Sequence, residues 1–297
     1  MKYSLAVAAW CAASAAFAAP GGDILSLEEP FAGTAGTGRA NQAAEHPPGT
    51  EHRSRTRRTG GQHDGKRTEA KEFTGADGGV MRYRIAEKLP EDGEKIPLVV
   101  FMHGAGERGT DNAAQLKHGV GDIIDWLERH EKGYRLIAAQ VPPGERWVAV
   151  DRTAKSHIMP EKPSETMSLM LEFLDLQLAD PAGDTSRIYV TGISMGGYGT
   201  WDIVCRRPDV FAAAMPVCGG GDVEQAAKIA SIPVWAFHGS ADRTVRVCRS
   251  RNMVSALWAA GSDAHYREYP DAGHDVWTRT YRDAEVLAWF FRQKKSK

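Results

Sequence analysis

The sequence predicts an α/β protein in which a mostly parallel sheet is covered by helices. Short apolar runs without a polar face alternate with longer helical segments, as expected for strands that are buried on both sides. The 297 residues are 42% hydrophobic, and the 31 glycines follow no three-residue repeat, which excludes collagen-like and wholly disordered classes. In such proteins the connections are right-handed and ligands bind beyond the carboxyl ends of the strands.

The amino-terminal part of the chain does not share this pattern. An uncharged apolar run follows Lys2 and ends at small residues, which predicts a signal peptide over 1–18. Residues 19–72 are rich in Gly, Ala, Pro and charge without an apolar period, which predicts a disordered basic linker. The folded domain is then expected over 73–297 of a secreted or periplasmic protein. Cys11 offers a lipid anchor as an alternative, although a bulky residue precedes it.

Charge and cysteine content exclude several kinds of partner. The net charge is −1, from 37 Lys and Arg against 38 Asp and Glu, so we expect no nucleic-acid partner. No later segment has enough consecutive apolar residues for a membrane span. The cysteines after the signal region show no C-x-x-C spacing, which disfavours a zinc site. Cys218 and Cys248 could form one bridge, or Cys205 and both of these remain free thiols.

Each strand is expected at a short apolar run. The first run alternates apolar residues with Arg82 and Arg84, which indicates a strand with one wet face. The next five runs are mostly apolar, which indicates strands buried on both faces, and a last strand is expected after them. The expected strands are 81–85, 97–102, 136–141, 188–191, 212–217, 233–237 and 266–269.

Helices are expected between these strands. Pro163 precedes one of them and Pro208 follows another, as is common at helix starts and ends. The expected helices are 113–129, 164–178, 195–206, 223–229, 247–260 and 283–293.

A nucleophile is predicted at Ser194. The run Gly192-Ile193-Ser194-Met195-Gly196 lies between a strand and a helix, where a sharp turn lifts the serine hydroxyl clear of the sheet. Glycines on both sides allow the strand and helix backbones to approach closely.

His274 is the expected base for this serine, because a free hydroxyl is a poor nucleophile near neutrality. It lies in a turn-rich stretch after the last expected strand. The expected acid is Asp242, which follows the strand 233–237 and can hold the imidazole in the required tautomer. Asp222 is the alternative candidate for the acid, but its position suits an N-cap of the next helix.

Two backbone N–H groups are expected to stabilise an oxyanion. Ala105 follows the strand 97–102 in a run of small residues, and Met195 follows the nucleophile directly. A purely structural tight turn at 103–106 is the alternative. The long loop 142–163 is expected to form one side of the substrate pocket. Trp147, which lies in this loop, and Trp277 are expected to bind substrate by stacking on its rings. Trp201 is expected to pack internally.

Four segments resemble secreted α/β-hydrolases of the phospholipase/carboxylesterase and polyhydroxybutyrate-depolymerase-like group. These are Phe101 to Gly109, Gly192 to Trp201, His238 to Asp242 and Gly273 to Trp277, and the resemblance covers about 73–292. The Ser, Asp, His order along the chain is also that of α/β-hydrolases. The resemblance implies an α/β-hydrolase fold without a large lid and a catalytic triad of Ser194, Asp242 and His274. It also implies oxyanion donors at Ala105 and Met195, as in feruloyl and acetyl esterases.

The expected reaction is therefore cleavage of acyl or feruloyl esters, including esters linked to polysaccharide, without a metal or organic cofactor. Two alternatives remain open. One is a serine peptidase of the prolyl-oligopeptidase type, although those usually add a gating domain. The other is a non-catalytic binding module on the same fold.

Overall fold

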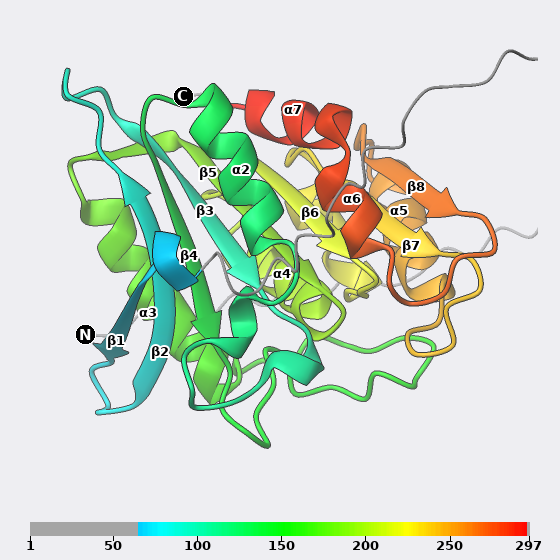
Figure 1. Cartoon of the computed structure of the whole chain (residues 1–297). Helices are drawn as coiled ribbons and strands as arrows, with labels where there is room; N and C mark the ends of the chain where they lie inside the picture. The colour runs from blue at the N-terminus through cyan, green and yellow to red at the C-terminus, as the bar shows by residue number, and fades with distance from the viewer. Residues whose placement is uncertain (1–64, 296–297) are drawn as a thin grey trace, which may run out of the picture. The chain divides into compact units, whose positions relative to one another are not determined.

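Eight strands form one sheet in the computed structural model, which describes residues 65–295 (Figure 1). The spatial order is β1-β2-β4-β3-β5-β6-β7-β8. β1 pairs antiparallel with β2 and β2 with β4, and all further neighbours pair parallel. The predicted α/β class with a mostly parallel sheet is confirmed. The strands are β1 (Glu69–Thr74), β2 (Val80–Lys88), β3 (Ile96–Met102), β4 (Tyr134–Gln140), β5 (Gly183–Ile193), β6 (Ala213–Val217), β7 (Trp235–Gly239) and β8 (His265–Tyr269).

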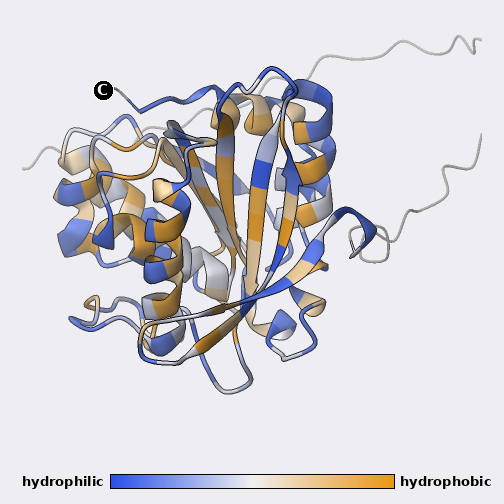
Figure 2. Cartoon of the chain, turned by 90° about the vertical axis from the view of Figure 1, so that its left-hand side faces the viewer, coloured by the Kyte–Doolittle hydropathy of each residue, from blue (hydrophilic) through white to orange (hydrophobic). Residues whose placement is uncertain are grey.

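The central strands are buried on both faces, which explains why their sequences are mostly apolar. Every residue of β3, β4 and β6 is buried. Helices α2 (Val120–His130), α6 (Trp277–Arg282) and α7 (Ala284–Arg292) pack on one face. Helices α3 (Glu165–Ala179), α4 (Met195–Arg206) and α5 (Cys248–Ala259) pack on the other. Figure 2 shows the hydrophobic residues gathered along the strands between these two helical layers.

The amino-terminal boundary of the domain differs from the prediction. β1 begins at Glu69, so the boundary expected at residue 73 falls inside a strand of the sheet. Most of β1 is exposed, and half of its residues are charged, because it lies at the edge of the sheet, and an edge strand needs no apolar period. The predicted signal peptide 1–18 and most of the predicted linker, 19–64, lie outside the described residues.

Three helical segments also differ from the expectation. The expected helix 113–129 is divided into the 3₁₀-helix η2 (Ala114–Leu116) and α2, because Gly119 has a φ of 78° and packs against Tyr281. Segment η3 (Val223–Ile229) is a 3₁₀-helix rather than an α-helix, and the short helix α6 was not expected.

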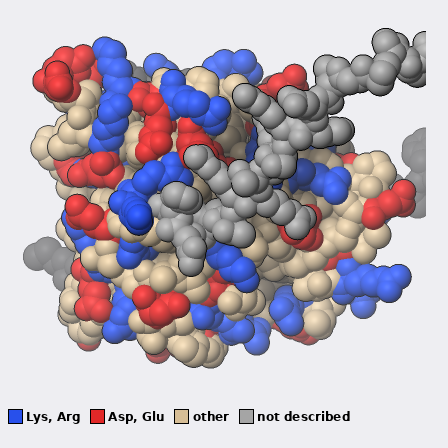
Figure 3. Space-filling view, viewed as in Figure 1, with Lys and Arg blue, Asp and Glu red and all other residues tan. Residues whose placement is uncertain are grey.

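The distribution of surface charge and the state of the cysteines are both consistent with the composition of the sequence. Basic and acidic side chains are intermixed over the face seen in Figure 3, as the near-zero net charge suggests. Among residues 65–295, no helix is both long and apolar enough to cross a membrane. Cys205, Cys218 and Cys248 are all free thiols, so the bridge considered between the last two is absent.

Chain connectivity brings several loops together at one edge of the sheet. After β3 the chain adds β4 on one side and then β5 on the other, so the connections reverse direction at β3 and β5. Such a reversal leaves a crevice beyond the carboxyl ends of these strands. The segments that follow β3, β5, β7 and β8 contain the predicted catalytic residues and oxyanion donors and Trp277, and the segment after β4 contains Trp147.

Candidate active site

Ser194 lies on a strained turn between β5 and α4. Its φ of 53° and ψ of −114° are unusual for a residue with a side chain. The turn is tight, since a Cβ on Gly196 would lie 1.9 Å from the carbonyl oxygen of Met102, and a Cβ on Gly192 would lie 2.5 Å from that of Gly196. Only glycine fits at these two positions. Ser194 is 8% exposed, and the residue lines a cavity.

The structure brings Ser194, His274 and Asp242 into one hydrogen-bonded line. The Oγ of Ser194 lies 2.8 Å from Nε2 of His274, and Nδ1 of His274 lies 2.6 Å from Oδ2 of Asp242. A carboxylate can only accept, so Nδ1 donates to Asp242 and leaves Nε2 free to accept the serine proton. The Sγ of Cys218 donates to the carbonyl oxygen of His274, which helps to hold this loop.

Asp242 is buried and fully hydrogen-bonded. Its Oδ1 accepts from the backbone N–H groups of Thr244 and Val245, at 2.8 and 2.9 Å. Burial acts to raise the pKa of its carboxyl, but hydrogen bonds from His238, His274 and the backbone outweigh burial and hold the pKa well below its usual range. The carboxylate therefore stays ionised at any pH near neutrality.

His238 is a second imidazole on the same carboxylate. Its Nε2 lies 3.2 Å from Oδ2 of Asp242 and 3.0 Å from the carbonyl oxygen of Val245, so this nitrogen must be a donor. Its Nδ1 lies 2.7 Å from Oγ of Ser250. Sequence reasoning did not assign a role to His238 or Ser250. The spacing of four residues between His238 and Asp242 was the only feature of the sequence that indicated a contact between them.

Asp222, the alternative acid, has a structural role instead. Its side chain caps η3 by accepting from the backbone N–H of Glu224 at 3.1 Å. It also accepts from the backbone N–H of Met159 at 2.9 Å, which ties the long loop after β4 to this turn.

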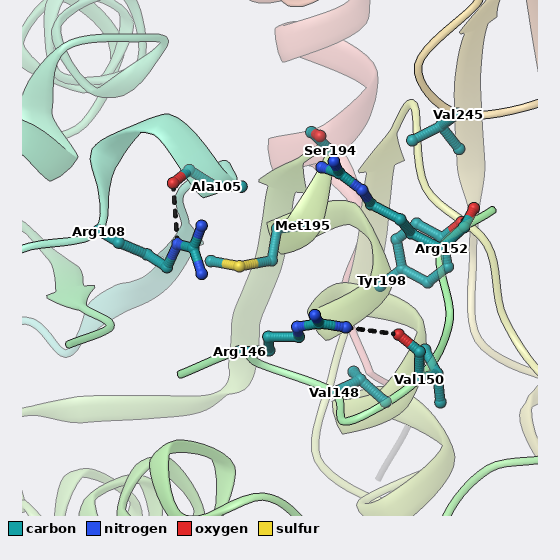
Figure 4. Close-up of a pocket in the computed structure, with 10 residues that line it drawn as sticks. All are labelled: Ala105, Arg108, Arg146, Val148, Val150, Arg152, Ser194, Met195, Tyr198 and Val245. Atoms are coloured by element: carbon teal, nitrogen blue, oxygen red, sulfur yellow. Dashed lines mark hydrogen bonds between the residues drawn. The ribbon is translucent and has the colours of Figure 1, made fainter. Parts of the chain in front are cut away.

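Ala105 and Met195, the expected oxyanion donors, both line the cavity beside Ser194 (Figure 4). Ala105 begins the 3₁₀-helix η1 (Ala105–Glu107), and Met195 begins α4, so the N–H groups of both lie at the start of a helical segment. His103 anchors this loop, because its Nδ1 contacts the carbonyl oxygen of Gly104 at 2.6 Å and its Nε2 accepts from Val141 at 2.9 Å.

The cavity beside Ser194 has a volume of about 150 Å³. Its apolar wall comes from valines and from Met195 and Tyr198, and its polar wall comes from arginines (Figure 4). The loop after β4 forms one side, as expected from its length and position. The complete lining is Ala105, Arg108, Arg146, Val148, Val150, Arg152, Ser194, Met195, Tyr198 and Val245.

The structure corrects the expectation that Trp147 stacks on a substrate. Its side chain is 0% exposed, and its Nε1 donates to the carbonyl oxygen of His103 at 3.1 Å. The ring therefore supports the loop from inside, because its apolar surface is covered by the core. Trp277 is partly buried and packs edge-on against His274 at 5.2 Å, outside the cavity lining. Trp201 is fully buried, as expected for a packing residue.

Cys218, His238 and Asp242 have potential ligand atoms within 4.8 Å of one another. Their chemistry does not suit a metal ion. Burial raises the pKa of the Cys218 thiol well above its usual value, so sulfur stays protonated, and it already donates to His274. Both nitrogens of His238 are occupied by protein partners.

Comparison with known proteins finds esterases of known structure among the proteins that this chain is similar to. A thermostable esterase of known structure is 35% identical, with a TM-score of 0.70, over 77% of this chain and 64% of that chain. A ferulic acid esterase is 18% identical, with a TM-score of 0.56, over 76% of this chain and 98% of that one, which shows the fold alone.

Among curated proteins, poly(3-hydroxyalkanoate) depolymerase C of Paucimonas lemoignei is 43% identical over 49 residues, or 16% of this chain. The chain spans only 12% and 34% of the length of the curated relatives that it matches. Membership of the depolymerase-like group therefore stays a prediction. A family model matches a much longer segment of the chain, residues 90–288. On this match the chain belongs to the dienelactone hydrolase family.

Proposed function

We propose that this protein is an exported serine hydrolase that cleaves carboxylic esters through an acyl-enzyme. The observation that supports this most is the hydrogen-bonded line from Ser194, which lines a cavity, through His274 to Asp242. The 35% identity to an esterase supports ester substrates. The predicted signal peptide over 1–18 supports export, and we propose that the folded domain alone performs the reaction.

In the proposed reaction, Ser194 Oγ attacks the ester carbonyl carbon while its proton passes to Nε2 of His274. The carbon–oxygen bond to the alcohol then breaks, and the departing oxygen takes this proton. Water attacks the acyl-enzyme in the same way, with His274 again as base, and releases the acid and free serine. Asp242 stays ionised throughout and stabilises the imidazolium that forms twice in each turnover.

The negative charge that develops on the carbonyl oxygen needs fixed donors. We propose the backbone N–H groups of Ala105 and Met195, since both residues line the cavity beside Ser194. Fixed backbone donors of this kind need no reorganisation during the reaction, and one such donor contributes about 10²–10³ in turnover.

The direct test is hydrolysis of p-nitrophenyl acetate by the purified protein and by Ser194→Ala. We expect the variant to lose essentially all activity and to keep the melting temperature of the wild type, because only one oxygen at the wall of a cavity is removed. Equal rates in the two proteins would refute the proposal, and so would a wild-type protein that hydrolyses no ester.

A substrate panel separates the narrower alternatives. Acetyl-xylan, methyl ferulate, polyhydroxybutyrate and acylated peptides probe the acetyl, feruloyl, polyester and peptidase possibilities under the same conditions. Ester cleavage without peptide cleavage is the result expected here. Faster cleavage of peptides than of any ester would favour the peptidase alternative.

A further inference from the structure

Strand β6 contributes none of the three catalytic side chains, but its end contacts all the segments that do. The carbonyl oxygen of Val217 accepts from the backbone N–H of Ser194 at 2.8 Å. The N–H of Cys218 donates to the carbonyl oxygen of Phe237, in the strand that precedes the acid, at 2.8 Å. The Sγ of Cys218 donates to the carbonyl oxygen of His274 at 3.2 Å. Two adjacent residues therefore connect the turn of the nucleophile, the strand of the acid and the loop of the base.

Cys218 has a strained backbone at the end of β6. Its φ is 51°, in the left-handed region that residues with a side chain rarely adopt. Among residues 65–295, the other non-glycine residues with positive φ are Asn112, Ser194 and Asp271, and the last two lie at the ends of β5 and β8. Strained residues persist only where surrounding contacts hold them, and they gather at functional sites. Cys218 therefore belongs with the strained turns around the triad.

The thiol of Cys218 keeps its proton. The residue is 0% exposed, and its Sγ lies within 4.8 Å of a carboxylate oxygen of Asp242. Burial, and then the negative charge of Asp242, raise the pKa of the thiol well above its usual value. Sulfur is therefore a hydrogen-bond donor at every pH near neutrality, and the carbonyl oxygen of His274 is its acceptor.

The backbone of His274 has few other tethers. Earlier in this loop, the carbonyl oxygen of Ala272 accepts from the N–H of Ala241 at 2.9 Å, which joins the loop to the segment after β7. At His274 itself, the carbonyl oxygen accepts from the N–H of Val276 in its own turn at 3.0 Å. Within the described part of the chain, the thiol of Cys218 is the only hydrogen-bond partner from another element that reaches the backbone of His274.

The contacts of the His274 side chain change during the proposed reaction. In the resting enzyme Nδ1 contacts Asp242 and Nε2 contacts Ser194. The second contact is lost in the acyl-enzyme, because the serine oxygen is then bonded to the acyl group and Nε2 must accept a proton from water. At that stage the position of the imidazole depends on Asp242, on edge-on packing with Trp277 and on the backbone of its loop. A tether on this backbone is therefore most useful during deacylation.

We propose that Cys218 is a positioning residue for the base. Its thiol fixes the backbone of His274 and so keeps the imidazole on Asp242 while Ser194 is acylated. This inference rests on the proposed serine-hydrolase reaction. Cys218 does not line the cavity beside Ser194, so loss of the thiol should slow turnover rather than weaken substrate binding.

Kinetics of Cys218→Ala with p-nitrophenyl acetate test the proposal. We expect kcat to fall about threefold to tenfold, because one hydrogen bond is lost. The ratio kcat/KM reports only the steps up to acylation, so it should change by less than about twofold. Cys218→Ser should recover most of kcat, because a hydroxyl can also donate to His274. Cys205→Ala is the matched control, since Cys205 is the other buried free thiol and lies in α4 outside the cavity lining.

Three outcomes would overturn the proposal. The first is a kcat of Cys218→Ala equal to that of the wild type or of Cys205→Ala. The second is a Cys218→Ser variant as slow as Cys218→Ala, which would show that the donor is irrelevant. The third is a fall in kcat/KM as large as the fall in kcat, which would place the defect in acylation. If Cys218→Ala does not fold, Cys218→Gly takes its place, because glycine removes the thiol and also relieves the strain of the positive φ.

Proton NMR separates this proposal from the esterase proposal. The proton between Nδ1 of His274 and Asp242 gives a strongly downfield resonance when it is held in a short hydrogen bond. We expect this resonance in the wild type, Cys218→Ser and Cys205→Ala, and a broadened or absent one in Cys218→Ala. If esters are cleaved but the resonance and kcat are the same in all four proteins, the positioning role is refuted and the esterase stands. If Cys218→Ala alone loses the resonance but no protein cleaves an ester, the esterase fails and the positioning role remains.

Discussion

Asp242 shares one carboxylate oxygen between two imidazoles, and only one of them reaches Ser194. His274 contacts Oδ2 at 2.6 Å and His238 contacts the same oxygen at 3.2 Å. His238 is 0% exposed and is held by Ser250 on its other side. The carboxylate therefore cannot rotate away from His274 without breaking a buried hydrogen bond. We interpret His238 as a positioning residue that acts through Asp242.

Substituting His238 tests this role. His238→Leu should lower kcat for a short ester by about tenfold with little change in KM, because a hydrogen bond to a charged group is lost away from the substrate. His238→Gln should recover part of kcat, since its amide N–H can replace the donor. Steady-state kinetics measure both parameters, with melting temperatures as the control for folding. Equal kcat in His238→Leu and the wild type would contradict the interpretation.

At the scale of elements, the approach of β5 and α4 to β3 shapes the site. The backbone of α4 passes so close to the end of β3 that a Cβ on Gly196 would lie 1.9 Å from the carbonyl oxygen of Met102. This close packing forces the positive φ of Ser194 and brings its hydroxyl to the loop that contains Ala105. The strain at one residue is stabilised by packing between two strands and a helix.

Gly196→Ala is expected to disturb this packing. The melting temperature should fall by about 10 °C or more, since backbone atoms must move to admit the methyl group. Gly106→Ala is the control, because a Cβ at Gly106 would meet no atom within 4 Å. Thermal unfolding followed by circular dichroism compares the two. A Gly196→Ala protein as stable as Gly106→Ala would show that the turn is more tolerant than its geometry indicates.

For the whole molecule, the buried histidine His103, just before Ala105, links stability to pH. Burial lowers the pKa of His103 to about 4, and its Nε2 must be unprotonated to accept from the N–H of Val141. The unfolded imidazole takes up its proton near pH 6.5. Between pH 4 and 6.5 the unfolded chain therefore binds more protons at this position than the folded chain. The contribution of His103 to stability is fully present above pH 6.5 and is lost as the pH falls towards 4.

Urea unfolding at pH 7 and at pH 4 measures this effect. The contribution of His103 to the free energy of unfolding should fall by roughly 3 kcal/mol over this range. His157, whose pKa is also lowered to about 4 by burial and by Arg249, acts in the same direction. His103→Asn should show a smaller loss between the two pH values than the wild type. An identical loss in both proteins would exclude His103 as a source.

Much of the fold was predictable because its signals are local. Buried parallel strands are mostly apolar, so β3, β4 and β6 were identified from their own residues. β1 was not, because an exposed edge strand pairs through its backbone and needs no apolar residues. The break in the expected helix 113–129 depends on contact between Gly119 and Tyr281, which are far apart in the sequence.

The sequence by itself determined the α/β class, the turn at Ser194 and the loops that contain Asp242 and His274, because each is encoded by neighbouring residues after a strand. Only the tertiary structure decided which side chains meet. It buried Trp147 beneath the loop that contains Ala105, placed His238 on Asp242 and brought Ala105 and Met195 to the same cavity as Ser194. Those outcomes depend on contacts between distant segments, and packing rather than local pattern selects such contacts.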